Sequence, residues 1–107
     1  MELPDDVISK RSELVSVANA MLDSKMDLIE GVRRVCSLRL AIDDPDNDVF
    51  IPFRAIESET DHFPLGEMRS RCSTDYLQRM DADMTLYLSD AKQDILNGCK
   101  EIIRILS

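Results

Sequence analysis

The chain has 107 residues, which is the size of one domain, and its hydrophobic fraction of 44% excludes an intrinsically disordered protein. A formal net charge of −8 argues against binding to DNA or RNA, which requires a basic surface. No apolar run approaches the roughly 18 residues of a membrane span, and the N-terminal MELPDDVISKR lacks the apolar core of a signal peptide, so we expect a soluble, cytoplasmic protein.

The first predicted helix covers residues 4–22. Pro4 is acceptable in a first turn, and Asp5 and Asp6 place negative charge at the positive end of the helix dipole. The apolar residues recur close to the helical period and are Val7, Ile8, Leu14, Val15, Ala18, Met21 and Leu22. One face of this helix should therefore be buried.

The second predicted helix covers residues 25–41, with Ser24 as its N-cap. Its apolar stripe consists of Leu28, Ile29, Val32, Val35, Cys36 and Leu40. Gly31 costs about 1 kcal/mol relative to alanine in a helix, so we expect a close helix–helix contact there. The very short link to the first helix predicts an antiparallel helical hairpin.

Residues 42–66 predict an ordered, irregular connector. The sequence DDPDND is typical of a turn, and VFIPFRAI at 49–56 is β-branched and aromatic but interrupted by Pro52. We therefore expect at most a short edge strand, or an extended segment that its apolar side chains hold against the helices.

The last predicted helix begins at Ser73 or Thr74 and continues to about residue 106. Apolar residues spaced by three or four positions follow its whole length, and they are Leu77, Met80, Met84, Leu88, Ala91, Ile95, Cys99, Ile102 and Leu106. We expect Met84, Ala91 and Ile95 to be buried against Ala18 and Val32 of the hairpin.

This last helix would be roughly 50 Å long, about twice the length of each of the others. It must bend, break or extend past the hairpin, and an exposed apolar stripe would favour a homodimer. We accordingly predict an all-α fold in one domain, residues 1–107, with a helical hairpin packed on one long C-terminal helix.

The connector holds most of the excess negative charge. Residues 42–64 contain seven acidic residues against Arg54 alone, a net charge of −6, whereas residues 1–41 and 65–107 each carry −1. A patch of one sign accelerates association with an oppositely charged partner. We predict that this patch binds a basic partner protein, and its candidate residues are Asp43, Asp44, Asp46, Asp48, Glu57, Glu59, Asp61 and His62.

The patterns for metal binding are incomplete. Asp44, Asp46 and Asp48 resemble the start of an EF-hand calcium loop, but Val49 stands where that loop needs glycine and Ala55 where it needs glutamate. His62 is the only histidine, and the chain has no CxxC pair, so a zinc-type ligand set is missing. We predict no metal site and no cofactor.

The three cysteines, Cys36, Cys72 and Cys99, predict free thiols rather than a disulfide framework, because their number is odd. Cys72 and His62 could be combined as a nucleophile and its base, but nothing in the sequence places them together. A glycine-rich loop that could hold an oxyanion or a phosphate is absent too. We therefore predict no enzymatic activity.

The segment FIPFRAIESETDHFPLGEMR, residues 50–69, resembles a segment of small bacterial proteins without an assigned function. It covers about a fifth of the chain and brings no catalytic motif. The whole profile, which is small, acidic and helical with its charge on one surface, is similar to that of immunity proteins of bacterial toxin systems.

This similarity implies a cytoplasmic protein that binds a basic toxin domain, such as a nuclease, and occludes the Lys and Arg side chains that otherwise hold phosphate. Two alternatives remain open. One is a homo-oligomeric structural or regulatory protein whose long helix forms the interface, and the other is a metal-dependent enzyme.

Overall fold

The computed structural model describes residues 3–107, and these residues form helices and no strand. The four α-helices are α1 (Asp5–Leu22), α2 (Leu28–Leu38), α3 (Ile51–Thr60) and α4 (Thr74–Leu106). Three short 3-10 helices lie between them, namely η1 (Arg39–Ala41), η2 (Asp48–Phe50) and η3 (Gly66–Arg71). The predicted all-α class is confirmed. None of the described helices combines the length and apolarity that a membrane span requires.

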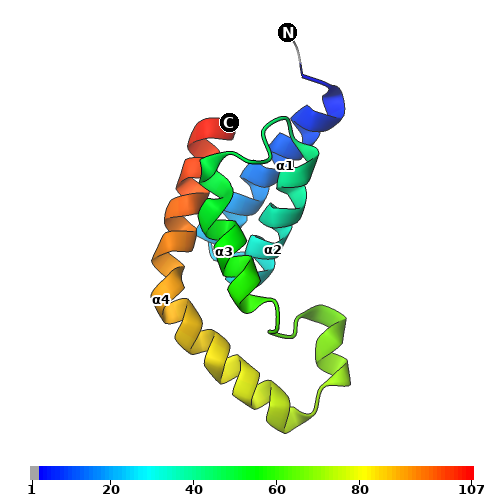
Figure 1. The fold of residues 1–107 in the computed structure, drawn as a ribbon, viewed down its shortest axis with the longest axis vertical. Coiled ribbons are helices and arrows are strands. Elements are labelled where there is room, and N and C mark those ends of the chain that lie inside the picture. The colour runs from blue at the N-terminus through cyan, green and yellow to red at the C-terminus, as the bar shows by residue number, and fades with distance from the viewer. Residues whose placement is uncertain (1–2) are drawn as a thin grey trace.

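The helices pack in a ring, because α1 contacts α2 and α4, while α3 contacts the other faces of α2 and α4 (Figure 1). Only the C-terminal part of α4 belongs to this bundle. Its N-terminal part continues beyond the ends of the other helices, so the molecule measures 54 × 26 × 23 Å. We call residues 74–86 of α4 the arm.

The predicted hairpin of α1 and α2 is confirmed, but Ser24 does not cap α2. Ser24 adopts a φ of 58°, in the left-handed region, and reverses the chain after α1. The backbone N–H groups of Ser24 and Lys25 donate to the carbonyls of Met21 and Ala20, which satisfies the end of α1. Asp27 caps α2 instead, since its carboxylate accepts from the Glu30 N–H at 3.0 Å.

The second helix is shorter than predicted at both ends. It begins at Leu28, and after Leu38 the chain tightens into η1. A 3-10 turn has three residues per turn, so the side chains lose the phase of the α-helical stripe. Leu40 is consequently 67% exposed, although the sequence pattern placed it on the buried face.

The predicted edge strand or extended segment at residues 49–56 is wrong, because these residues form η2 and most of α3. Pro52 lies in the first turn of α3, where a missing N–H leaves no intrahelical bond unmade. The side-chain oxygen of Asn47 starts η2 by accepting from the Val49 N–H at 2.9 Å. Phe53, Ile56 and Thr60 are then spaced as one helical face, and all three are buried.

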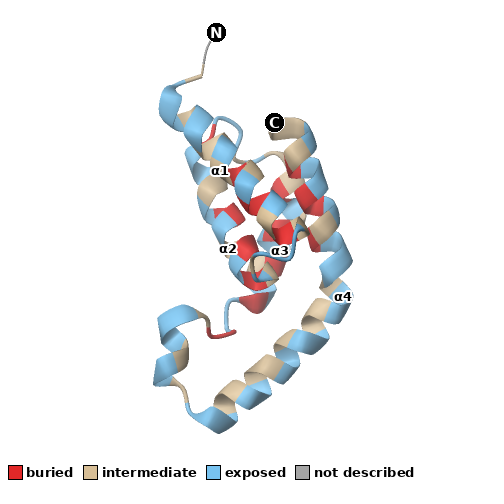
Figure 2. Cartoon of the chain, turned by 180° about the vertical axis from the view of Figure 1, so that it is seen from behind, coloured by how far each residue is buried: buried red, intermediate tan, exposed pale blue. Residues whose placement is uncertain are grey.

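The core lies inside the ring of helices and is mainly aliphatic (Figure 2). Ile95 is fully buried in the same cluster as Ala18 and Val32, as predicted. Ala91 packs at the edge of this cluster, whereas Met84 lies on the arm outside it, so the expected burial of Met84 is wrong.

The predicted start of α4 is confirmed, since the Ser73 hydroxyl accepts from the Tyr76 N–H at 3.2 Å. All the buried residues of α4 lie in its C-terminal part, between Ile95 and Ile102. Two parallel hydrogen bonds of 2.8 Å from the Arg69 guanidinium to the Asp81 carboxylate attach η3 to the arm. The N-terminal part of α4 therefore extends past the hairpin, which is one of the three arrangements predicted from the length of this helix.

The predicted close contact at Gly31 is confirmed. A Cβ atom at this position would overlap the thioether of Met21, which is 1% exposed. The absent side chain allows α1 and α2 to approach each other closely.

Candidate functional site

The predicted acidic residues lie in four places: the loop between η1 and η2, η2 itself, α3 and the turn after α3. Asp43, Asp44 and Asp46 lie in the loop between η1 and η2. Two of them are ion-paired, with Arg11 Nη1 at 3.0 Å from Asp43 and Arg39 Nη1 at 3.6 Å from Asp46. The Asn47 side-chain amide donates to Asp44 at 2.9 Å. Much of the charge of this loop is therefore used to hold the loop in place.

Asp61 and His62 follow the C-terminus of α3, about 15 Å from its start. Both are exposed, and His62 Nδ1 lies 4.0 Å from Asp61 Oδ1. The His62 ring packs on Phe63, with 4.2 Å between the ring centroids. Within residues 3–107, the structure shows no charged partner of the His62 imidazole besides Asp61 and no metal-binding group around it.

Glu57 is half-buried and close to Cys36 of α2. Burial, followed by the negative charge of Glu57, raises the pKa of the Cys36 thiol to about 12. Burial alone raises the pKa of Cys99 to about 11. Both thiols stay protonated at neutral pH, and a protonated thiol is a poor nucleophile.

The strongest candidate site is a groove between α3 and α4, which lie side by side (Figure 1). It consists of two neighbouring depressions of about 320 and 350 Å³, which share the lining residues Pro52 and Asp94. The residues that line it are Asp48, Val49, Pro52, Ala55, Ile56, Glu59, Tyr87, Asp90, Ala91, Asp94, Asn97, Gly98 and Glu101. We call this feature the acidic groove.

The helical period explains why these residues meet. On α4, the groove residues Tyr87, Asp90, Asp94, Asn97 and Glu101 are spaced by three and four positions, so they share one face. This face lies next to the buried stripe of the same helix. On the opposite wall, Pro52, Ala55 and Glu59 share one face of α3, and Asp48 of η2 precedes them.

The acidic groove carries five carboxylates, and none of its lining residues is Lys or Arg. Two carboxylates have partners: Glu59 accepts from the Tyr87 hydroxyl at 2.6 Å, and Glu101 pairs with Arg104 at 2.6 Å. The structure shows no ion pair within residues 3–107 for Asp48, Asp90 or Asp94. The groove therefore has an uncompensated negative potential.

Tyr87 stays protonated and serves as a hydrogen-bond donor in this groove. Burial, followed by the hydrogen bond to the Glu59 carboxylate, raises the pKa of its hydroxyl to about 12. The Phe63 ring packs edge-on against Tyr87, with 6.5 Å between the centroids. This contact connects the end of α3 to α4 where the arm leaves the bundle.

Sequence reasoning found Asp48 and Glu59 of the acidic groove but missed Asp90, Asp94 and Glu101. The acids and bases of residues 65–107 nearly cancel when they are summed along the chain. On a helix, however, Lys92 lies about 160° from Asp90, so the charges separate onto different faces. The spacing of Asp90, Asp94 and Glu101 by four and seven positions puts them on one helical face, and this spacing is visible in the sequence.

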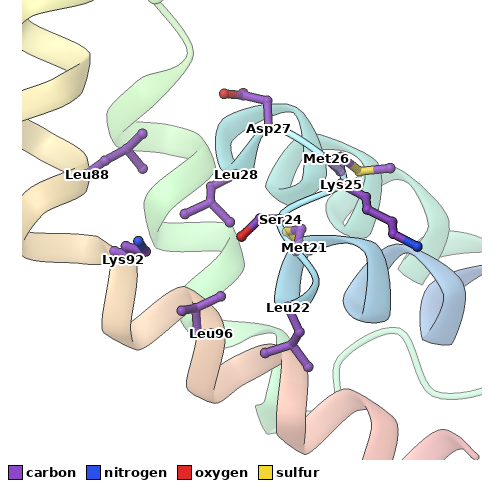
Figure 3. Close-up of a pocket in the computed structure, with 10 residues that line it drawn as sticks. All are labelled: Met21, Leu22, Ser24, Lys25, Met26, Asp27, Leu28, Leu88, Lys92 and Leu96. Carbon is purple, nitrogen blue, oxygen red and sulfur yellow. The ribbon is translucent and has the colours of Figure 1, made fainter.

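A third depression, of about 490 Å³, lies outside the acidic groove on another side of α4, beside the turn between α1 and α2 (Figure 3). Leu88 and Leu96 of α4 face Leu22 and Leu28 of the hairpin across it. Its charged residues are Lys25, Lys92 and Asp27, so it has no excess of negative charge. A basic partner would therefore prefer the acidic groove.

No group of three or more His, Cys, Asp or Glu side chains within residues 3–107 is arranged to hold a metal ion. The Cys72 thiol donates to the Met68 carbonyl at 3.2 Å rather than to His62.

No protein-family model matches the chain, and comparisons with curated proteins and with solved structures also find no match.

Proposed function

We propose that this protein binds a basic partner protein through the acidic groove. The observation that supports the proposal is a lining that combines carboxylates, with no Lys or Arg among them, and five apolar residues, which we call the floor: Val49, Pro52, Ala55, Ile56 and Ala91. Protein interfaces combine an apolar centre with a polar rim in this way. The negative potential would attract a basic partner and accelerate its association.

The predicted connector residues extend the same surface beyond the groove. Asp46 is two residues from Asp48 at one end, and Asp61 and His62 follow Glu59 at the other end. Glu57 faces Cys36 and contributes less. The proposed interface is thus centred on the acidic groove, with the acidic loop and the end of α3 as its rim.

The partner that fits best is a basic toxin domain such as a nuclease, which makes this chain an immunity-type inhibitor in the bacterial cytoplasm. The groove carboxylates would pair with the Lys and Arg side chains that hold phosphate in the toxin. A bidentate Arg–carboxylate pair is stronger than an ordinary surface ion pair. The mechanism is occlusion, so the chain itself needs no catalytic group.

The test uses a partner that is co-purified from the source cells and then purified. The variant Asp90→Asn/Asp94→Asn removes two groove charges without touching the core. The control Asp75→Asn/Asp83→Asn makes the same change on exposed residues of the arm. We expect the groove variant to associate about tenfold more slowly at low salt, with a weaker salt dependence, and the control to behave as wild type.

If the partner is a nuclease, the groove variant should also inhibit it less than the control does. An association rate that is the same for wild type, groove variant and control would rule out the acidic groove as the recognition surface.

A second function, a homo-oligomer built on α4, is favoured by one observation. The arm extends beyond the bundle with half-exposed Leu77, Met80 and Met84, while Leu86 is 69% exposed. Exposed apolar surface of this kind favours self-association. Light scattering at micromolar concentration should give a dimer mass that Leu86→Glu reduces to a monomer mass. A monomer mass for the wild type would exclude this function.

A further inference from the structure

We infer that the acidic groove binds a basic amphipathic helix of the partner; this inference rests on the proposed function and specifies what the partner inserts. The first argument is the length of the groove. Its α4 wall runs from Tyr87 to Glu101, which is about 21 Å of helix, and its other wall runs from Asp48 to Glu59, about 16 Å. Three to four turns of a partner helix match this length.

The floor of the groove allows a helix to approach closely. Several residues of the lining are small or compact, namely Ala55 and Pro52 on α3 and Ala91 and Gly98 on α4. Helices pack with their axes about 8–10 Å apart, and small side chains favour the shorter separations. A helix placed over α3 and α4 would cover both depressions at once.

The structure of the walls excludes a peptide that adds as a β-strand. A peptide that binds in β-conformation needs free backbone N–H and C=O groups on an edge strand. Both walls are mainly α-helical, so their backbone groups are already bonded within the helices. Recognition must therefore come from side chains, and a helix presents these with its own backbone satisfied.

The carboxylates define the pattern that this helix must carry. Asp90, Asp94 and Glu101 form a row along the α4 wall, and Asp48 and Glu59 stand near the two ends of the α3 wall. A helix with Lys or Arg on both flanks of a narrow apolar stripe would pair with both rows. Its apolar stripe would contact Val49, Ile56 and Ala91 on the floor.

The test uses synthetic peptides of about 18 residues, long enough to span the groove with one turn to spare. The first peptide places Leu and Ala on one helical face and Lys and Arg on both flanks. The second has the same composition in scrambled order, and the third is the first with a central proline, which breaks the helix. Binding is measured by fluorescence anisotropy, and NMR amide shifts locate the peptide on the protein.

We expect the amphipathic peptide to bind at least about tenfold more tightly than the scrambled or proline peptides. The amides of Ala55, Ala91 and Gly98 should shift most, and helical circular dichroism should increase on mixing. The variant Asp90→Asn/Asp94→Asn should weaken binding about fivefold or more, whereas Asp75→Asn/Asp83→Asn should leave it within about twofold.

Equal binding of the three peptides would overturn helix recognition but leave the acidic interface standing. Amide shifts centred on Leu28 and Leu88, in the third depression outside the acidic groove, would overturn helix recognition by the groove as well. Absence of binding by every peptide would also reject the helix. In that case, an unchanged association rate of the natural partner with Asp90→Asn/Asp94→Asn would reject the proposed function too.

Discussion

Gly98 of α4 packs tightly against Phe53 of α3, because a Cβ atom at position 98 would lie 2.6 Å from Cε2 and 2.8 Å from Cζ of the Phe53 ring. Phe53 is fully buried, so the ring has little room to move away. The missing side chain of Gly98 thus sets the distance between the two walls of the acidic groove.

The substitution Gly98→Ala should destabilise the protein. Overpacking a core costs about 1–3 kcal/mol, and the better helix propensity of alanine returns only about 1 kcal/mol. The matched control is Gly31→Ala, where the obstacle is the flexible Met21 side chain, and we expect a smaller loss. Denaturant unfolding of both variants tests this, and a Gly98→Ala protein as stable as Gly31→Ala would contradict it.

Two residues of the same apolar stripe should respond very differently to truncation. Ile95→Ala should cost about 2–5 kcal/mol, because Ile95 is fully buried in the core cluster. Met84→Ala should cost less than about 1 kcal/mol, because Met84 lies half-exposed on the arm. Equal losses in denaturant unfolding would show that the arm is packed as tightly as the bundle.

The Arg33 side chain holds the end of α3 in place. One of its nitrogens, Nη2, donates to the carbonyls of Thr60 and Phe63 at 2.8 and 2.9 Å. Arg33→Met should remove both bonds and cost about 1–3 kcal/mol, since the two carbonyls lose a charged donor. Amide hydrogen exchange should become faster at Phe63 but not in the middle of α1.

The control for this experiment is Arg34→Met, since Arg34 is the exposed neighbour on the same helix. If the two variants exchange alike, the guanidinium of Arg33 does not fix the connector.

The ion pair between Arg69 and Asp81 should weaken in acid. Hydrogen bonds from Arg69, followed by its positive charge, hold the pKa of Asp81 below its ordinary value of 3.8. A group with a lowered pKa in the folded state stabilises that state above the unfolded pKa, and the effect is lost as the pH falls through the folded pKa. Attachment of the arm to η3 should therefore be complete at neutral pH and be lost in acid below pH 3.8.

Carbon NMR titration of the Asp81 carboxylate measures this directly. The midpoint should lie below 3.8 in the wild type and rise in Arg69→Gln. Identical midpoints in the two proteins would mean that the ion pair does not form in solution.

The sequence was sufficient for the long helix and the hairpin, because both depend on periodicity and on local capping. The regular spacing from Leu77 to Leu106 allows few structures besides one helix, and Ser73 provides its cap. The α3 helix was missed because ten residues offer only three buried positions, and Pro52 with its β-branched neighbours suggested a strand. A proline at this position in the sequence is compatible both with an edge strand and with the first turn of a helix.

The acidic groove could be predicted only in part, since a charge count along the chain ignores the face on which each residue lies. The connector acids were easy to find because they are close in sequence. Asp90 and Asp94 line a groove only because α3 lies beside α4. The sequence analysis predicted no helix at the position of α3. The groove depends on that helix pair, so it could not be recognised before the pair was known.

The completion of the core by α4 has a consequence for how the chain is made. The thiol of Cys99 lies 4.0 Å from the Met21 thioether, across 78 positions of sequence. Contacts this distant require closure of a long loop, which costs entropy and slows folding. During translation, α1, α2 and α3 can pack on one another, but the faces that contact α4 stay uncovered until the ribosome has released Ile102. The nascent chain therefore exposes apolar surface to chaperones and proteases until then, so its biosynthesis should depend on protection that the finished fold no longer needs.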